Sequence, residues 1–135
     1  MSDAQGSVWY ATQSDVAVVH LNRPPVNAID LEMVGKLGLT LDELAHKRGL
    51  RGVVLAGTGV NFAAGLDTKA VPTYSADQLR ELSAAINRVV LMLYGSPLPT
   101  VAAIAAPRSA AASASRSPAT IASAPTRRHV SVCRR

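Results

Sequence analysis

The chain has 135 residues, a formal net charge of +5 and a pI near 10, and its length is enough for one domain with its own hydrophobic core. The single cysteine, Cys133, excludes an internal disulfide, and the three scattered histidines show no metal-ligand spacing. The sequence starts with polar residues and has no apolar run near the ~20 residues of a membrane span, so we expect a cytoplasmic protein with no membrane partner.

The positive charge is confined to the end of the chain. Residues 1–105 carry eight Lys and Arg against nine Asp and Glu, whereas residues 106–135 carry six Arg and no acidic residue. The Ala, Ser, Arg and Pro of this tail cannot fill a core, and the tail lacks the interleaved aromatic residues of a single-strand-binding protein. We therefore expect a domain over 1–105, a disordered or irregular basic tail over 106–135, and no nucleic-acid partner.

Two β-rich runs open the domain. Val8–Thr12 and Val16–Leu21 are separated by three polar residues, a pattern that predicts a β-hairpin. The second strand ends before Pro24 and Pro25, because proline supplies no ladder donor and holds the preceding residue extended.

A helix and a buried strand follow the hairpin. Asp30 is suited to cap a helix that runs to about Lys47. The apolar positions of this helix recur at three- and four-residue steps: Val34, Leu37, Leu41 and Leu44. The apolar run Gly52–Gly57 predicts a buried strand, and the glycines at its end lack the further Gly or Lys of a nucleotide-binding motif.

The stretch from Asn61 to Lys69 is the candidate functional loop. It follows the buried strand, and we expect the residues after it to open a helix. The first amides of a helix have no partner within it, so they are free to bind an oxygen that becomes negative during a reaction. Small residues at Ala63, Ala64 and Gly65 let a ligand approach the backbone closely. On spacing alone, an ordinary strand-to-helix connection explains the same pattern.

A second long helix follows this loop. Ser75 and Gln78 have the spacing of a capping box and predict a helix from Ala76 to Tyr94. We expect its apolar face to be core: Leu79, Leu82, Ile86, Val89, Val90 and Leu93. Two prolines then end the helix, and Thr100–Ala105 predicts a short apolar strand.

Four of these segments resemble the motifs of one family. Phe62–Lys69 is Phe-Ala-Ala-Gly-Leu-Asp-Thr-Lys, which resembles the F-x-A-G-x-D-x-K signature of the crotonase superfamily, the enoyl-CoA hydratases and isomerases. Leu21–Ala28 resembles the family's L-N-R-P-x-x-N-A turn, Gly52–Gly57 its central strand, and Pro97–Ala105 the strand before its second glycine-rich loop. The resemblance covers about residues 8–105. It implies an α/β fold that contains only the first repeats of the crotonase ββα spiral.

The resemblance also implies roles for the residues of both loops. In the family, two backbone N–H groups hold the thioester oxygen of an acyl-CoA and stabilise the enolate that develops. Leu66 occupies the position of the first donor. The implied substrate and CoA contacts are Pro25, Val26, Ala28, Phe62, Ala64, Gly65, Asp67, Thr68 and Lys69. We expect Asp67 to order the turn rather than carry a proton, and for Lys69 a CoA contact and a solvated side chain are equal alternatives.

No separate cofactor is implied, because coenzyme A is part of the substrate. The resemblance further implies a homo-oligomer, a trimer or hexamer, for the intact protein.

The tail contains the family's next motif in another reading frame. If the codons from Ser117 to Thr126 are read from their third bases, permitted codons spell Ala-Cys-Asp-Tyr-Arg-Val-Gly-Pro-Asp. The residues from Ala105 can likewise yield Gly-Ala-Ala-Ile-Gly-Gly-Gly-Leu-Gly-Leu-Ala-Leu, which resembles the family's second oxyanion loop. We therefore hypothesise a one-base slip near Ala105, natural or from sequencing. A genuine disordered tail is the alternative, and the nucleotide sequence distinguishes the two.

The tail as printed supplies none of the family's remaining catalytic groups. The glycine of the second donor is replaced by Pro107–Ala110, and the glutamates that hydratases use as acid and base have no counterpart in residues 106–135. Glu32, Glu43 and Glu81 fall on predicted helices and do not match the family's catalytic positions.

We therefore expect a family member that acts on a fatty acyl-CoA when intact and a chain that is truncated, inactive and poorly soluble as it stands. The alternative is a non-catalytic fragment that associates with intact crotonase subunits.

Overall fold

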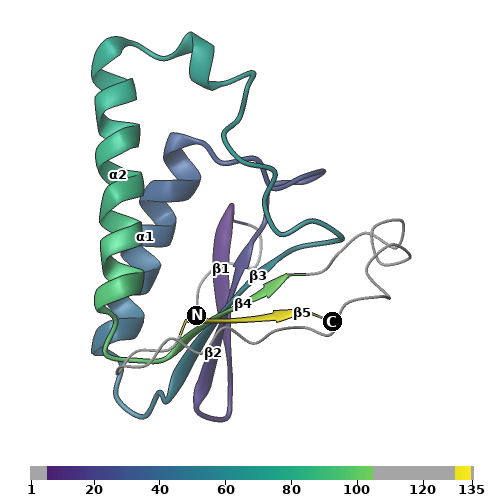
Figure 1. Cartoon of the computed structure of the whole chain (residues 1–135), viewed down its shortest axis with the longest axis vertical. Helices are drawn as coiled ribbons and strands as arrows, with labels where there is room; N and C mark the ends of the chain where they lie inside the picture. Colours follow the sequence, from purple (N-terminus) through teal and green to yellow (C-terminus); the bar gives the residue numbers. More distant parts are fainter. Residues whose placement is uncertain (1–5, 105–129, 135) are drawn as a thin grey trace.

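The computed structural model of the protein describes residues 6–104 and 130–134. The described elements are β1 (Val8–Gln13), β2 (Val16–Leu21), α1 (Leu31–His46), β3 (Gly52–Gly57), the 3-10 helix η1 (Val71–Thr73), α2 (Ala76–Gly95), β4 (Thr100–Ile104) and β5 (Val130–Arg134). The described strands form one sheet in the order β1-β2-β3-β4-β5. The hairpin β1-β2 is antiparallel, and every later pair is parallel. Figure 1 shows α1 and α2 side by side, on one side of the sheet.

The hydrophobic core lies between the sheet and the two helices. Alternate residues of β2 and β3 are buried, because successive side chains of a strand point to opposite faces. The strands contribute Val8, Ala17, Val19, Leu21, Val53 and Leu55, and the helices contribute Met33, Val34, Leu41, Leu44, Leu82 and Val89. Complete burial of one such large side chain stabilises the fold by roughly 1.5–3 kcal/mol.

Both helices begin at the predicted caps. The carboxylate of Asp30 accepts a hydrogen bond from the backbone N–H of Met33 at 2.8 Å. Ser75 and Gln78 form the predicted capping box, in which each side chain accepts from the other residue's backbone N–H, at 3.2 and 2.9 Å. The polar side chains therefore satisfy backbone donors that a helix start leaves unpaired.

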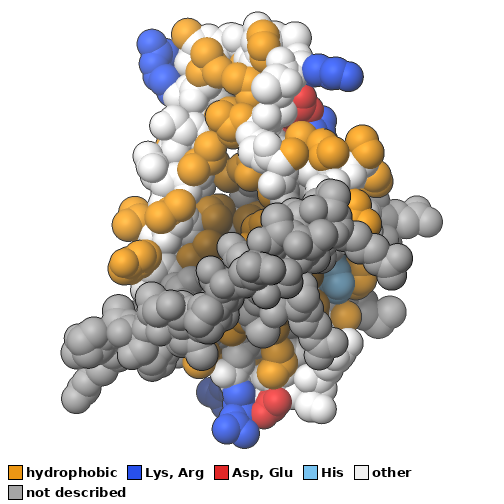
Figure 2. Space-filling model, turned by 45° about the vertical axis from the view of Figure 1, so that its right-hand side comes forward, with side chains coloured by type: hydrophobic (Ala, Val, Ile, Leu, Met, Phe, Trp, Pro, Cys, Tyr) orange, Lys and Arg blue, Asp and Glu red, His pale blue; other side chains and the backbone are white. Residues whose placement is uncertain are grey.

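The predicted apolar face of α2 is only partly core. Leu82 and Val89 are buried, whereas Leu79 and Val90 are 42% and 51% exposed. The difference arises because α2 packs along one narrow face, and a side chain at the flank of that face has no neighbour to cover it. Figure 2 shows hydrophobic side chains over much of the visible surface, with Lys and Arg side chains towards its two ends.

The last described segment, Val130–Arg134, pairs with β4 in parallel, with Thr100 opposite Val130 and Ile104 opposite Arg134. The sequence predicts no regular structure here, and over these five residues the structure differs. A strand forms because β4 otherwise presents an unpaired edge and the segment contains β-branched residues. The rest of the predicted tail, residues 105–129 and 135, lies outside the described residues, and the predicted domain boundary at 105 stays a prediction.

Three strands deliver their ends to the same edge of the sheet. Because β2, β3 and β4 are parallel, their carboxyl ends lie together, with Leu21 opposite Gly57 and Ala56 opposite Ala103. The loop over residues 22–30 leaves β2 at this edge, and the loop over residues 58–75 leaves β3 beside it. In open parallel sheets this is the edge at which ligands bind.

Candidate functional site

A short parallel bridge joins the two loops. The backbone N–H of Ile29 donates to the carbonyl of Gly65, and the N–H of Asp67 donates to the carbonyl of Ile29, both at 2.8 Å. The side-chain amide of Asn61 donates to the carbonyl of Pro25 at 3.5 Å, which adds a weaker contact between the loops. The two loops predicted to contact the substrate are therefore hydrogen-bonded to each other and form one unit.

The N–H of Leu66 is a free donor held within this unit. Since Gly65 and Asp67 face Ile29 through the bridge, the N–H of the residue between them points away from it. Within residues 6–104 and 130–134 this N–H makes no hydrogen bond, and Leu66 is 48% exposed. Gly65 has a φ of 93°, in the left-handed region that favours glycine, so the chain turns sharply just before the donor.

The side chain of Asn27 links the first loop to the second. It is completely buried, its side-chain amide donates to the carbonyls of Thr58 and Asn61 at 3.0 and 2.8 Å, and its side-chain oxygen accepts from the N–H of Arg23 at 2.9 Å. Its φ of 54° lies in the left-handed region, which asparagine tolerates better than most residues. One side chain thus holds three backbone groups from both loops.

Arg23 also links the two loops. Its Nη1 donates to Asp67 Oδ2 at 2.6 Å and to the carbonyl of Ala28 at 3.1 Å, and its Nε lies 3.2 Å from Asp30 Oδ2. Asp30 is also the cap of α1, so the same guanidinium ties both loops to the start of a helix.

These contacts fix the charge state of Asp67. The hydrogen bond from the Arg23 guanidinium, followed by those from the amides of Lys69 and Ala70, lowers the pKa of Asp67 to about 2. The carboxylate is therefore ionised at neutral pH, and both of its oxygens already accept hydrogen bonds. This geometry suits a structural group and does not suit a proton carrier.

The helical segment expected after the loop is a short 3-10 helix, η1, and the long helix α2 starts later. The Asp67 carboxylate takes the amides of Lys69 and Ala70, a 3-10 turn follows, and α2 begins only at Ala76. Pro72 stands in the first turn of η1, and the amides of Lys69 and Ala70 before it are occupied by the Asp67 carboxylate. The exposed donors of this loop are therefore amides of non-helical backbone, Leu66 among them, rather than the N-terminus of an α-helix.

The other predicted contacts divide by exposure. The exposed ones are Pro25, Val26, Ala64, Gly65, Thr68 and Lys69. Ala28 is half-buried, and Phe62 packs against the hydrophobic core rather than standing in solvent. Their role as acyl-CoA contacts stays a prediction.

Gly57, Asn27 and Arg23 are positioning groups to which the sequence analysis gives no role. A Cβ at Gly57 would collide with the backbone of Asn61 and Phe62, so the loop after β3 folds back directly over the strand end. An asparagine soon after two prolines is a recognisable turn signal. The Arg23–Asp67 pair spans 44 residues, and no local pattern indicates it.

No glutamate lies at the loops in the part of the chain that the structure describes. Glu32 pairs with Lys36 at 2.7 Å, Glu43 accepts a hydrogen bond from Tyr10, and Glu81 lines a groove between the helices. As the sequence predicts, all three lie on helices, with Glu32 in the first turn of α1, directly after the first loop.

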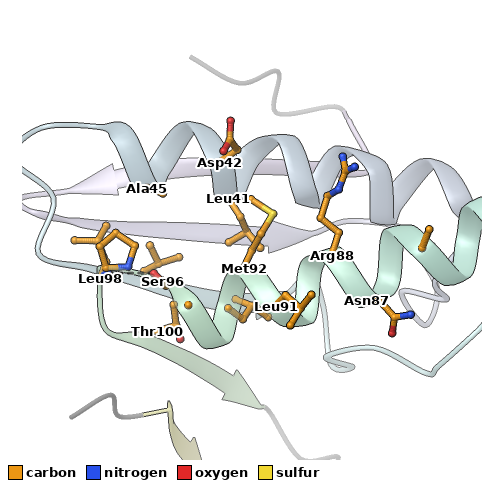
Figure 3. Close-up of a pocket in the computed structure, with 15 residues that line it drawn as sticks. Leu41, Asp42, Ala45, Asn87, Arg88, Leu91, Met92, Ser96, Leu98 and Thr100 are labelled. Atoms are coloured by element: carbon orange, nitrogen blue, oxygen red, sulfur yellow. Dashed lines mark hydrogen bonds between the residues drawn. The ribbon is translucent and has the colours of Figure 1, made fainter.

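Two hollows, of about 530 and 730 Å³, are elsewhere on the molecule. Figure 3 shows the first, between the C-terminal halves of α1 and α2 and the start of β4, with Leu41, Met92 and Thr100 among the residues that line it. The second is the groove between the two helices. None of the predicted contact residues lines either of these two hollows.

Two further findings concern only the described residues. No three His, Cys, Asp or Glu side chains come together there in a way that could hold a metal ion. Neither described α-helix has the length and apolarity to cross a membrane.

Comparison with known proteins identifies the class. Residues 11–112 match the family model of enoyl-CoA hydratase/isomerase. A Thermus thermophilus protein whose name assigns it to the enoyl-CoA hydratases is 38% identical over 96 residues, 68% of this chain and 38% of the relative. Human mitochondrial enoyl-CoA delta isomerase 1 is 36% identical over 91 residues, 66% of this chain and 30% of the relative. The crystal structure of an enoyl-CoA hydratase/isomerase from Xanthobacter autotrophicus Py2 is 32% identical, with a TM-score of 0.68 over 76% of this chain and 39% of that one.

The chain belongs to the enoyl-CoA hydratase/isomerase family. The predicted resemblance and the predicted fold class, the first part of an α/β crotonase fold, are confirmed. The family match continues to residue 112, beyond the 105 expected from the motifs. The chain spans only about two fifths of the length of the Thermus and Xanthobacter proteins and less of the human one. Hydratases and isomerases both occur among these relatives.

Proposed function

We propose that this protein binds the thioester group of an acyl-CoA at the loop edge, with the N–H of Leu66 as one donor of an oxyanion hole. The observation that carries the proposal is the exposed, unpaired N–H of Leu66, flanked by two backbone groups that the bridge to Ile29 holds in place. A preorganised amide stabilises an oxygen that becomes negative, and loss of one such donor costs about 3–4 kcal/mol of barrier.

The exposed residues of both loops supply the contacts to the rest of the substrate. The first loop offers Pro25, Val26 and Ala28 to the CoA moiety, and the second offers the small residues Ala64 and Gly65 beside the donor. Lys69 and Thr68 follow in the same loop, where a cation and a hydroxyl suit the phosphates and amides of coenzyme A. Phe62 acts from below, because it packs the loop onto the core.

The chain as it stands binds acyl-CoA without turning it over. An enolate needs a group that moves the proton. Asp67 is held as a carboxylate by Arg23, and Glu32, the glutamate that follows the first loop, is paired with Lys36. The second donor of the family is also absent from the printed tail. A reading-frame slip near Ala105 accounts for both losses, and the family motif encoded in the other frame of the tail supports it.

With the frame restored, the intact protein is a hydratase or isomerase of fatty acyl-CoA metabolism, a homotrimer or hexamer in the cytoplasm. Crotonyl-CoA hydration, followed as loss of ultraviolet absorbance, tests both parts. We expect no turnover from the 135-residue chain and clear turnover from the frame-restored protein. Turnover by the 135-residue chain would contradict the proposal, as would genomic DNA with no hidden glycine loop after Ala105.

The exposed apolar surface of α2 supports a second candidate function, association with intact crotonase subunits. Leu91 and Tyr94 are 71% and 77% exposed, and exposed large apolar side chains that lie together are typical of a surface that binds another protein. Co-expression with a full-length family member and capture through a tag on this chain tests the idea. Capture that disappears in a Leu91→Lys, Tyr94→Lys variant supports it, and the absence of capture by the unaltered chain rejects it.

A further inference from the structure

We propose that Arg23 and Asn27 are positioning residues that aim the Leu66 N–H and set the spacing between the thioester site and the CoA site. The inference rests on the proposed function, because it concerns how the same donor is held. Neither side chain touches the substrate in this proposal. Each acts through the backbone of the loop that carries Leu66.

The two side chains fix the donor segment at both of its ends. Asn27 holds the carbonyls of Thr58 and Asn61, where the segment leaves β3. Arg23 holds the carboxylate of Asp67, the residue directly after the donor. The bridge to Ile29 holds the peptide plane of Leu66 directly, and the contacts of Asn27 and Arg23 fix the segment on either side of it, while the N–H of Leu66 stays unpaired among the described residues.

The same contacts reach back into the first loop. Arg23 also donates to the carbonyl of Ala28, and Asn27 accepts from the backbone N–H of Arg23. A change at either residue therefore alters the distance between the two loops as well as the direction of the donor. Free CoA has no thioester oxygen and does not use the Leu66 N–H, whereas an acyl-CoA does, so the direction of this donor affects the binding of the acyl-CoA and not that of free CoA.

The chemistry of these side chains is specific. Arg23 contacts three acceptors in different directions at 2.6–3.2 Å, which a planar guanidinium can do and a lysine ammonium on its flexible stem cannot reproduce. Asn27 combines two donated bonds and one accepted bond with a left-handed backbone. Glycine keeps that backbone conformation and removes only the side-chain bonds.

The experiment compares two ligands on the full 135-residue chain. Titration calorimetry gives the affinities for two ligands. Acetoacetyl-CoA carries the thioester and forms an enolate, whereas free CoA has no thioester. The near-ultraviolet absorbance of bound enolate gives a second readout that a merely structural role would not change. The variants are Arg23→Lys and Asn27→Gly, with Arg51→Gln as the matched control, because Arg51 is an exposed arginine paired with Asp15 far along β2 from the loops.

We expect the unaltered chain to prefer acetoacetyl-CoA over free CoA. Both variants should lose about tenfold of that preference, the effect of one misaligned charge-assisted hydrogen bond, with free CoA affinity unchanged and the enolate signal reduced. The control should behave as the unaltered chain. Melting curves accompany each titration, and Arg23→Lys keeps charge and bulk so that a folded variant is available.

The outcomes separate the two proposals. An unaltered chain that binds neither ligand, or both equally, overturns the proposed function. An unaltered chain with the expected preference, together with folded variants that retain it, overturns the positioning roles alone. Equal loss of both ligands in a folded variant also overturns them, because it shows general damage to the surface.

Discussion

The loop edge and the helical side of this molecule differ in how completely their side chains find partners. At the loop edge, Asn27, Arg23 and Asp67 pair with one another and with nearby backbone, and no buried side-chain polar atom lacks a partner in the described part of the chain. On the helical side, Leu91 and Tyr94 stand largely in solvent. The chain therefore completes the scaffold of its site and leaves a hydrophobic surface uncovered.

The contrast has a physical origin. A buried polar group that loses its partner costs about 1–3 kcal/mol, so a polar network has to be complete within the segment that folds. An exposed apolar face leaves no hydrogen bond unmade, so the segment folds without a cover for it, although the uncovered face favours association or aggregation. The span of about two fifths of the Thermus relative fits a chain that lacks such a cover.

The strongest way to break the loop edge is to insert a methyl group at Gly57. Gly57→Ala places a Cβ against the backbone of Asn61 and Phe62, which cannot move without opening the loop, so we expect a loss of about 3 kcal/mol in the free energy of unfolding. The same substitution at Gly35, which has nothing within 4 Å, should instead stabilise α1 by about 0.5–1 kcal/mol. Urea denaturation of both variants checks the opposite signs. Equal effects would show that the loop does not close over β3.

Removal of the cap of α2 should have a smaller effect. Ser75→Ala deletes the acceptor for the Gln78 N–H and should lower the free energy of unfolding by about 1 kcal/mol. Ser83→Ala, at an exposed position inside the same helix, should leave stability unchanged or slightly higher. Thermal melts of the two alanine variants distinguish the cap from a general effect of losing a hydroxyl.

Acid should weaken the loop edge selectively. The folded-state pKa of Asp67 is about 2, below its ordinary value of 3.8, so its contribution to stability is fully present above about pH 4 and is lost as the pH falls towards 2. Asp67→Asn should therefore be less stable than the unaltered chain by a constant amount between pH 5 and pH 8. The difference should narrow below about pH 4, and melting temperatures measured across this range check it. If the difference in stability between the two proteins stayed constant down to pH 2, the ion pair of Asp67 with Arg23 would not be its cause.

The smallest effect on stability is expected where the helical side is exposed. Leu91→Lys and Tyr94→Lys should change the free energy of unfolding by less than about 0.5 kcal/mol, since both side chains already stand in solvent. The same pair should reduce aggregation, measured by light scattering at matched concentrations. Val89→Lys, at a buried position of the same helix, should unfold the protein instead.

Much of the fold follows from local patterns in the sequence. The hairpin, the cap of α1, the capping box of α2 and the strand β3 all rest on residues within a few positions of one another. Exposure of Leu79 and Val90 could not be predicted this way, because periodicity marks an apolar face without showing what covers it. Pairing of Val130–Arg134 with β4 is likewise a long-range contact without a local signal.

The candidate site was predictable in its location and only partly in its geometry. The motif from Phe62 to Lys69 indicates where the donor lies, but the bridge from Ile29 that orients it depends on a segment far away in sequence. Pro72 lies in the first turn of η1, where proline is tolerated, so the sequence did not indicate how short this helix is.

The end of β4 also has a practical consequence for protein engineering. Ile104 reaches the edge at which Leu66 lies, and the elements from β1 to β4 are complete before that point. A chimera that continues from Ile104 with the C-terminal portion of a full-length relative would therefore add the rest of the site to the loops around Leu66 without cutting any described helix. C-terminal portions of different relatives could be joined at the same position.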